Sequence, residues 1–310
     1  MKRFWIFCVI CLCLTGCGRA EQPVDGEKLQ IVTSNFPLYD FVRQIGGEEV
    51  EVRLLLPPGT ESHSFEPTPQ DMIAIQKADL FCYIGGESEA WVSELLKADR
   101  QTNGLALLSA VPVLEEETRE GMESGSHREH EAHAEADEHI WTSPVNAITM
   151  TRVICDALCE KDPAHEELYQ SNQKAYEEQL LQLDREFRET VAQSPRREII
   201  FGDRFPFLYF VREYGLSYYA AFPGCAAQAE PSAATLAFLI DKVKRDHVPT
   251  VFYLELSNQS IANAVAEAAG AKTALFHSCH NVSREEFRRG ESYLSLMTQN
   301  ATQLKEALRQ

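Results

Sequence analysis

The chain has 310 residues, of which 44% are hydrophobic and 25% charged, and this composition excludes a disordered, collagen-like or multi-span membrane protein. Acidic residues outnumber basic ones by 47 to 29, which gives a formal net charge of −18. Nucleic acid is not an expected partner, because phosphate binding needs a basic face. An acidic chain suits a cation or an extracellular location better. The length predicts about two domains.

The N-terminus has the features of an export signal. Two basic residues precede Phe4–Leu14, an unbroken apolar run of 11 residues. That run is shorter than the roughly 20 residues of a membrane-spanning helix and is typical of a secretory signal. The following Leu-Thr-Gly-Cys resembles a bacterial lipobox, with cleavage before Cys17 and lipid attached to it. We therefore predict a signal peptide at 1–16 and a lipid-anchored tether at 17–28, rather than a buried strand that happens to end in cysteine.

Export changes how the remaining cysteines are interpreted. The mature chain keeps five besides the lipidated one, and an odd number cannot all pair within one chain. Cys155 and Cys159 lie four residues apart in an apolar stretch and are expected to be buried thiols. Cys225 and Cys279 lie in loop-like segments, where either a disulfide between them or a position near a metal is compatible with the sequence. The fifth is Cys82.

From residue 29 onward, short apolar runs alternate with amphipathic stretches. The first half predicts strands and helices in the order strand 29–33, helix 39–45, strand 50–56, helix 69–77 and strand 79–84. Strands that alternate with helices favour βαβ units and a mostly parallel sheet. We assign this N-terminal α/β lobe to residues 29–162.

The segment 115–138 interrupts this pattern. It holds ten acidic residues and three histidines, and its one large apolar residue is Met122. A compact lobe is not expected to bury such a segment, so we predict a mobile surface loop.

A long helix is predicted at 163–194. Tyrosine, leucine, phenylalanine and valine recur there at spacings of three and four residues and form a mostly apolar stripe. No glycine or proline lies between Pro163 and Pro195, which favours one helix of roughly 45 Å over a helix hairpin.

After this helix the α/β pattern resumes in a C-terminal lobe at 195–310. Strands are predicted at 198–201, 216–221, 250–254 and 273–276, and helices at 232–244 and 260–269. The predicted fold class is therefore α/β, with two lobes that each contain a mostly parallel sheet, joined by one long rigid helix. Ligands of open α/β sheets lie beyond the carboxyl ends of the strands, so the cleft between the lobes is the expected pocket.

Three histidines follow strand ends or lie in the loops beyond them: His63, His139 and His277. Imidazole is the commonest metal ligand near neutral pH and suits Zn²⁺ or Mn²⁺. A histidine taken alone is more often a surface or hydrogen-bonded residue, and the spacing of these three fits no compact zinc-finger pattern.

The sequences around two of them are more specific. PPGTESHSFEPTPQD contains His63, and DEHIWTSP contains His139. Both segments resemble ligand motifs of the zinc/manganese substrate-binding lipoproteins of ABC importers, a family in which a long helix bridges two lobes. The resemblance covers residues 29–300 and implies metal-ligand roles for these two histidines.

The chain departs from the family at the other two ligands. Gly202 stands where we place the third family histidine, and its neighbour Asp203 offers an oxygen, although adjacent side chains of a strand point in opposite directions. His277 takes the place of the usual aspartate. The resemblance therefore implies His63, His139 and His277, with Asp203 as the first choice of fourth ligand. The other candidates are Glu230, Cys225, Cys279, His280 and water.

The acidic segment carries a further hypothesis. His127, His130 and His133 recur every three residues among carboxylates and resemble the loop of zinc-specific family members. They are predicted to form an auxiliary, weak cation collector; the alternative is a solvated linker.

The function implied by the resemblance is a monomeric, non-catalytic receptor. It would bind Zn²⁺, or alternatively Mn²⁺, at the extracytoplasmic face of the plasma membrane and deliver it to an ABC permease. The alternatives are a secreted zinc-dependent hydrolase and an adhesin-type surface lipoprotein. The hydrolase is disfavoured because the chain has no H-E-x-x-H or G-x-S-x-G motif. The choice of metal, the fourth ligand, the identity of the permease and the number of envelope membranes stay open.

Overall fold

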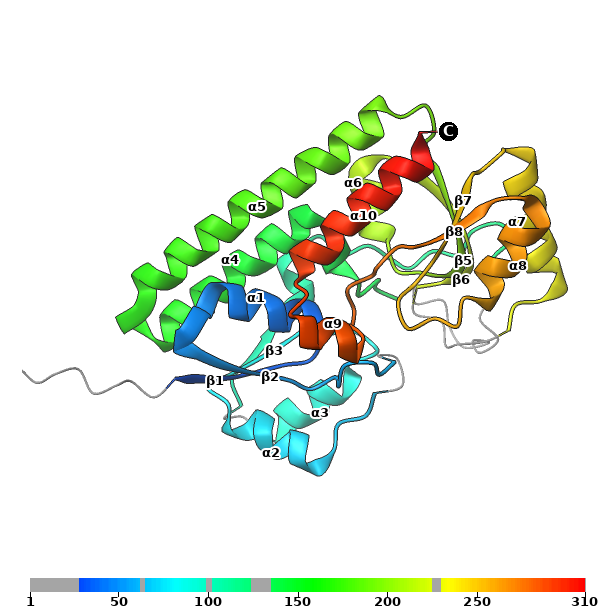
Figure 1. Cartoon of the computed structure of the whole chain (residues 1–310). Coiled ribbons are helices and arrows are strands. Elements are labelled where there is room, and N and C mark those ends of the chain that lie inside the picture. The colour runs from blue at the N-terminus through cyan, green and yellow to red at the C-terminus, as the bar shows by residue number, and fades with distance from the viewer. Residues whose placement is uncertain (1–27, 62–64, 99–101, 124–134, 225–229, 310) are drawn as a thin grey trace, which may run out of the picture.

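The computed structural model describes residues 28–61, 65–98, 102–123, 135–224 and 230–309. Two α/β lobes lie along one side of a layer of helices that contains the long helix α5 (Glu166–Gln193), which runs past both of them (Figure 1). The predictions for the signal peptide, the tether, Cys17, His63, Cys225 and the three loop histidines fall outside the described residues.

The first lobe is built on a four-stranded parallel sheet with the strand order β2-β1-β3-β4. Its strands are β1 (Leu29–Thr33), β2 (Val50–Leu54), β3 (Leu80–Tyr83) and β4 (Gly104–Ala106), and its helices are α1 (Phe36–Gly46), α2 (Pro69–Lys77), α3 (Ala90–Ala98) and α4 (Pro144–Lys161). The predicted strand at 29–33 and helix at 69–77 are confirmed with the same bounds. The helix predicted at 39–45 begins earlier, because the Asn35 side chain accepts a hydrogen bond from Leu38 N and caps it.

The second lobe has its own four-stranded parallel sheet, in the order β6-β5-β7-β8. Its strands are β5 (Glu198–Phe205), β6 (Ser217–Pro223), β7 (Thr250–Tyr253) and β8 (Lys272–Leu275), and its helices are α6 (Leu208–Tyr214), α7 (Ala233–Arg245) and α8 (Ser260–Ala269). The register between β5 and β6 shifts between Phe201 and Arg204. The predicted α/β fold class with two parallel sheets is confirmed.

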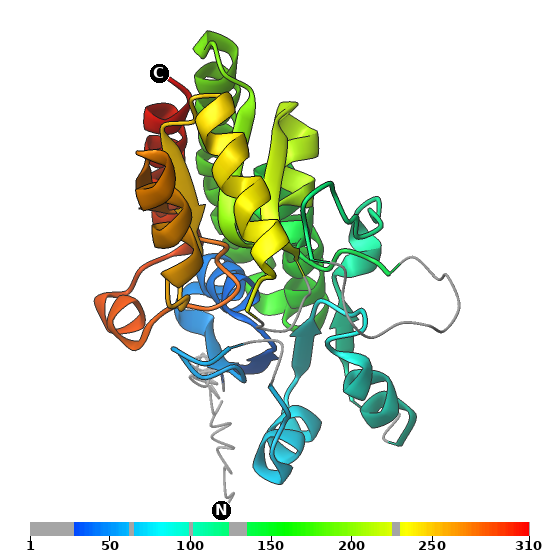
Figure 2. The same ribbon diagram turned by 90° about the vertical axis from the view of Figure 1, so that its right-hand side faces the viewer.

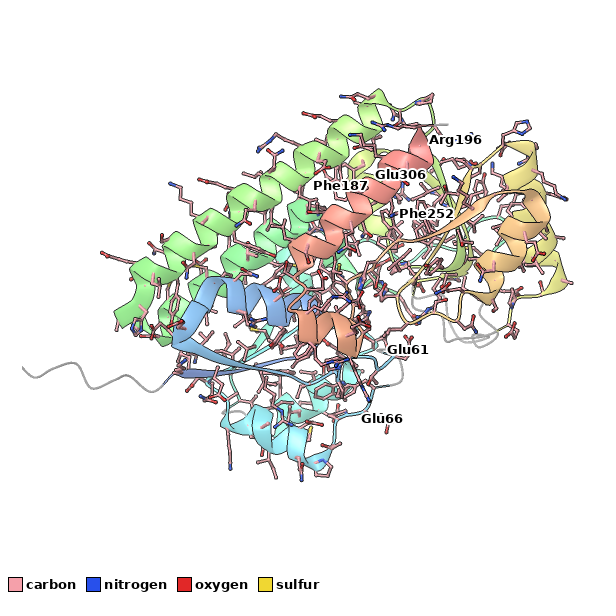
Figure 3. All side chains as sticks on the ribbon, viewed as in Figure 1. Glu61, Glu66, Phe187, Arg196, Phe252 and Glu306 are labelled. Carbon is pink, nitrogen blue, oxygen red and sulfur yellow. The ribbon has the colours of Figure 1, made fainter. Side chains whose placement is uncertain are left out.

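The predicted long helix is a single helix. A short 3₁₀ turn at Pro163–His165 leads into α5, which continues for 28 residues without a break. Its buried stripe packs against α1 and α4, and Phe187 points from α5 into the interior, as Phe252 does from β7 (Figure 3). Within the described ranges, no helix combines the length and the hydrophobicity needed to cross a membrane.

The chain after β8 contacts both lobes. Helix α9 (Arg284–Arg289) lies beside the first lobe, and α10 (Tyr293–Leu308) packs along α5 (Figure 1). Gly59 N donates to Val282 O at 2.7 Å, and Asn281 Nδ2 donates to Thr60 O at 2.8 Å. The segment that follows β8 was assigned to the second lobe alone, and it also holds the loop after β2 in place.

The acidic segment is partly packed, and the prediction of a mobile loop is wrong for residues 115–123. Met122 is buried, and Glu123 N donates to Ala221 O at 2.9 Å. Arg119 pairs with Glu117 and lies over the Tyr218 ring at 4.5 Å. These contacts fix the first part of the segment to the edge of the second sheet, seen on the right of Figure 2. The abundance of charge misled the prediction because the charges pair with one another.

Candidate functional site

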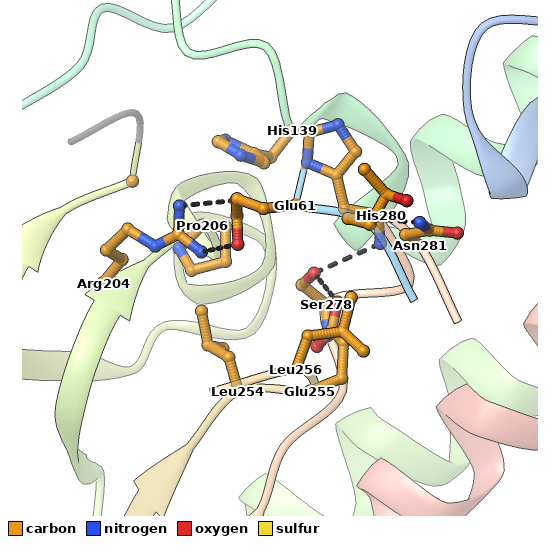
Figure 4. Close-up of a pocket in the computed structure, with 12 residues that line it drawn as sticks. Glu61, His139, Arg204, Pro206, Leu254, Glu255, Leu256, Ser278, His280 and Asn281 are labelled. Carbon is orange, nitrogen blue, oxygen red and sulfur yellow. Dashed lines mark hydrogen bonds and ion pairs between the residues drawn. The ribbon is translucent and has the colours of Figure 1, made fainter. Parts of the chain in front are cut away.

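A small pocket of about 20 Å³ lies where the two lobes meet (Figure 4). Glu61 and His139 line it from the first lobe, and Arg204 and Glu255 line it from the second. His280, from the loop after β8, completes the polar lining. A cavity needs roughly 10–15 Å³ to hold one water molecule, so this space suits a single ion better than an organic ligand.

His139 is held in a fixed orientation by Asp137. The ring is 1% exposed, and its Nδ1 lies 3.0 Å from Asp137 Oδ1, which also accepts a hydrogen bond from His139 N at 2.8 Å. This arrangement directs Nε2 away from the carboxylate, in the way that a carboxylate hydrogen-bonded to a metal-ligating histidine orients its ring. Burial favours a lower pKa for His139, but the Asp137 carboxylate outweighs it and raises the pKa above its ordinary value. The predicted role of His139 is therefore compatible with its place in the pocket.

His280 lies next to His139. The two ring centroids are 5.5 Å apart at an interplanar angle of 83°, and the Trp141 ring lies 4.8 Å from that of His280. A tight turn presents the His280 ring, because Cys279 has a positive φ of 62° and Ser278 Oγ accepts from His280 N at 3.2 Å. His280 was one of several candidates for the fourth ligand, and it is the candidate that the structure brings to His139.

His277 does not line this pocket, although the sequence led us to expect that it shares a site with His139. Its ring is buried, with Nδ1 accepting from Cys279 N at 2.9 Å and Nε2 3.7 Å from Glu286 Oε1. Burial favours a lower pKa for His277, but Glu255 and Glu286 outweigh it and raise the pKa. The ring stabilises the turn after β8 and faces α9, which is why its position at the strand end does not bring it to the cleft.

Asp203 and Gly202 do not line this pocket either. Asp203 accepts hydrogen bonds from Arg204 N at 2.9 Å and Leu254 N at 3.2 Å, and it lines a separate pocket. A Cβ at Gly202 would lie 2.4 Å from Ala262 Cα, so this position faces α8 and has no room for a ligand side chain. Arg204, which follows the register shift in β5, is the residue of this strand that lines the pocket. Asp203, predicted as the fourth ligand, thus lines the neighbouring pocket and not the one that contains His139.

Three charged residues of the pocket were missed by sequence reasoning. Arg204 forms a two-pronged ion pair with Glu61, with Nη1–Oε1 at 2.9 Å and Nη2–Oε2 at 3.1 Å (Figure 4). Glu255 accepts hydrogen bonds from Ser278 N at 2.7 Å and from Ser278 Oγ. Among the residues that the structure describes, no three His, Cys, Asp or Glu side chains stand in metal-binding geometry. The pocket supplies two imidazoles and two carboxylates, with one carboxylate bound to a guanidinium.

The described cysteines have the properties of structural thiols. Cys82, Cys155 and Cys279 are buried, and all of the described cysteines are free. Burial raises the pKa of Cys155 to about 12 and raises that of Cys279 well above its ordinary value. These thiols therefore stay protonated near neutral pH.

A second small cavity of about 30 Å³ adjoins His280 on the side of the first lobe. Glu89 lines it and accepts a hydrogen bond from Gly85 N at 2.7 Å. The residue as a whole is only partly buried, but its carboxyl group faces inward. Burial, reinforced by the nearby Glu138 carboxylate, raises the pKa of Glu89 to about 7.

The Glu89 carboxyl predicts a pH-dependent stability. Between its ordinary pKa of 4.5 and about 7, the folded chain keeps a proton that the unfolded chain releases. The free energy of unfolding should therefore fall as the pH rises through this window, by up to about 1.4 kcal/mol per pH unit from this group. Glu89→Gln should remove that contribution, whereas Glu87→Gln, at an exposed neighbour, should not. Urea unfolding of the metal-free parent and variants at pH 5 and pH 7.5 measures this change in the free energy of unfolding. An equal change between the two pH values in Glu89→Gln and in the parent would contradict the prediction.

The fold is that of a two-lobed α/β protein with an ion-sized pocket at the junction of its lobes. The family model described as zinc-uptake complex component A, periplasmic, matches residues 31–307. The chain belongs to this family.

Named relatives agree with this assignment. The chain is 35% identical over 303 residues to the zinc-binding lipoprotein AdcA of Streptococcus pneumoniae strain R6, covering 95% of this chain and 58% of that protein. It thus spans less than two thirds of that relative. It is 33% identical over 311 residues to the high-affinity zinc uptake system protein ZnuA of Bacillus subtilis, covering 97% and 94% of the two chains.

Solved structures show the same architecture. The Zn(II)-bound ZnuA-like domain of Streptococcus pneumoniae AdcA matches with a TM-score of 0.76 and 32% identity, over 92% of this chain and all of that one. The metal-dependent lipoprotein YcdH of Bacillus subtilis matches with a TM-score of 0.77 and 32% identity, over 91% of this chain. The predicted family resemblance is confirmed.

Proposed function

We propose that this chain is a solute-binding protein that captures Zn²⁺ between its lobes and delivers it to the permease of an ABC importer. The observation that carries the proposal is that His139 and His280, which are 141 positions apart in the sequence, meet in one ion-sized pocket. The Glu61 and Glu255 carboxylates line the same pocket. Family membership and the zinc-binding relatives support it.

The metal ligands we propose differ from the set that the sequence suggested. His139 and His280 supply two ring nitrogens, and His63, which lies outside the described residues, supplies a third from its motif. A nearby carboxylate completes the site. A site with nitrogen and oxygen ligands favours the borderline-soft ion Zn²⁺ over Mg²⁺ or Ca²⁺. Mn²⁺ is the alternative cargo.

The chain acts, in this proposal, as a receptor and not as an enzyme. A zinc hydrolase keeps one coordination position open for water beside a general base. In the described part of the pocket, the Glu61 carboxylate is bound to Arg204 and the Glu255 carboxylate to Ser278, so neither is placed as a base. Family membership in a zinc-uptake component points the same way.

The location and partners follow from the N-terminal sequence and the family. We propose that residues 1–16 are removed, that Cys17 carries lipid and that 17–28 tethers the protein to the extracytoplasmic face of the membrane. Residues 29–162, 163–194 and 195–310 are the proposed first lobe, linking helix and second lobe. The working unit is a monomer that meets its permease partner with the metal bound between the lobes.

The test is a zinc titration of the metal-stripped mature chain, with Mn²⁺ run in parallel. We expect one tight Zn²⁺ site per chain and additional weak binding from His127, His130 and His133. Deleting 125–133 should remove the weak sites and keep the tight one, because the described contacts of residues 115–123 are left intact. Isothermal calorimetry with a competing chelator measures both. A parent chain without a tight site would contradict the proposed function, and unchanged weak binding would contradict the auxiliary role of the loop.

A further inference from the structure

Arg204 carries a permanent positive charge inside the pocket that we propose for a cation. It is the one Lys or Arg among the described residues that line the pocket, and its side chain is only 10% exposed. A guanidinium cannot lose its proton at any physiological pH. A divalent ion that enters beside it is therefore repelled as long as the guanidinium stays there.

The ion pair with Glu61 also joins the two lobes. Arg204 ends β5 in the second lobe, and Glu61 follows β2 in the first. Both carboxylate oxygens of Glu61 are engaged, at 2.9 and 3.1 Å. A metal ion that is to use this carboxylate competes with Arg204 for its oxygens and their negative charge. Two-pronged Arg–carboxylate pairs are strong, so the exchange makes zinc binding weaker than the ligands alone would allow.

A second pocket lies on the other side of Arg204. It has a volume of about 230 Å³ and is also lined by Asp203, Glu230 and Asn258. Arg204 thus stands between a pocket that suits one ion and a larger one that has two carboxylates and room for a guanidinium. The larger pocket offers the displaced side chain a place where its charge is compensated.

Resting on the proposed function, we propose that Arg204 is a two-position switch that competes with the incoming ion. In the metal-free chain its guanidinium holds Glu61 and links the lobes. Zn²⁺ displaces the guanidinium, takes over the Glu61 carboxylate, and Arg204 moves into the larger pocket toward Glu230. Arg204 is thereby a specificity-determining residue, because an ion that binds imidazole and carboxylate weakly cannot displace it.

The test uses neutral replacements of Arg204 in the full mature chain. Arg204→Met keeps the length of the side chain and removes its charge, and it should tighten Zn²⁺ binding at least tenfold, with Arg204→Gln as a second neutral variant should the first fail to fold. Glu61→Gln and Glu230→Gln should each weaken zinc binding several-fold. Glu61→Gln removes the proposed carboxylate ligand, and Glu230→Gln removes the negative charge that would pair with the displaced Arg204 guanidinium. Arg188→Met is the matched control, because Arg188 pairs with Asp184 and Glu213 away from the pocket, and it should leave zinc affinity unchanged.

A second readout follows the guanidinium itself. The Arg204 Nε–Hε signal in ¹⁵N NMR, identified by its absence in Arg204→Met, should shift when one equivalent of Zn²⁺ is added, and the shift should differ in Glu230→Gln. If the parent and the neutral Arg204 variants bind zinc with equal affinity, and the Nε–Hε signal of the parent does not shift, this inference alone is overturned. Absence of zinc binding in the parent and in every variant overturns the proposed function and this inference with it.

Discussion

Replacing His280 by asparagine is expected to weaken zinc binding by more than tenfold, whereas the same replacement at His277 should leave the affinity within about twofold. His280 lines the pocket beside His139, with ring centroids 5.5 Å apart, and its loss removes one of the proposed nitrogen ligands. A tenfold change corresponds to about 1.4 kcal/mol of binding free energy, which is a low estimate for a metal–ligand bond. The measurement is a competition titration with a chelator of known zinc affinity.

The two variants are matched controls for one another. They make the same chemical change three residues apart in one loop. Asparagine at 277 keeps an oxygen that can accept the hydrogen bond now given by Cys279 N to His277 Nδ1 at 2.9 Å, so the turn is preserved. Circular dichroism checks the folding of both. If His277→Asn loses zinc and His280→Asn does not, the ligand set read from the sequence is right and the one proposed from the structure is wrong.

The contrast between these two histidines marks how far the sequence could take the site. The position of His277 directly after a strand was readable, but the direction of its ring was not. That direction depends on the left-handed backbone of Cys279, a conformation that a non-glycine residue adopts only when its surroundings impose it. His139 lies in the pocket between the lobes, where the sequence led us to expect it, and it follows Asp137 within a short local segment whose hydrogen bonds are internal.

Long-range partners and irregular strands escaped prediction for a similar reason. Glu61 and Arg204 are 143 residues apart and meet only once both lobes are folded. Strand alternation was used to judge Asp203 and Gly202, and the register shift in β5 invalidates that alternation at the residues concerned. Local signals gave correct bounds where caps are strong, as at Thr68, whose capping box with Asp71 begins α2. Helix α9 was not predicted, since its six residues are nearly all charged and carry no apolar period.

Trp141 is predicted to couple the stability of the fold to zinc affinity. It is fully buried two residues after His139, and its Nε1 donates to Ser278 O at 2.8 Å in the loop that presents His280. Its own carbonyl accepts from Tyr293 OH at 2.6 Å, which attaches the same point to α10. Trp141 thus fixes the loop that carries His280 relative to the segment that carries His139.

Trp141→Ala is therefore expected to lower the free energy of unfolding by roughly 3–5 kcal/mol, the usual cost of deleting a buried aromatic side chain. Trp141→Phe keeps most of the ring volume but leaves the Ser278 carbonyl without its donor, which costs about 1–3 kcal/mol. The phenylalanine variant should also bind zinc several-fold more weakly, because the His280 loop loses its anchor. Trp91→Phe is the matched control, since Trp91 lies on α3 and is only partly buried, and it should change stability by less than about 1 kcal/mol. Urea unfolding and zinc titration of the three variants separate the two effects. A Trp141→Phe chain with the zinc affinity and the unfolding midpoint of the parent would mean that the loop after β8 holds its conformation without Trp141, and that the coupling between core and pocket lies elsewhere.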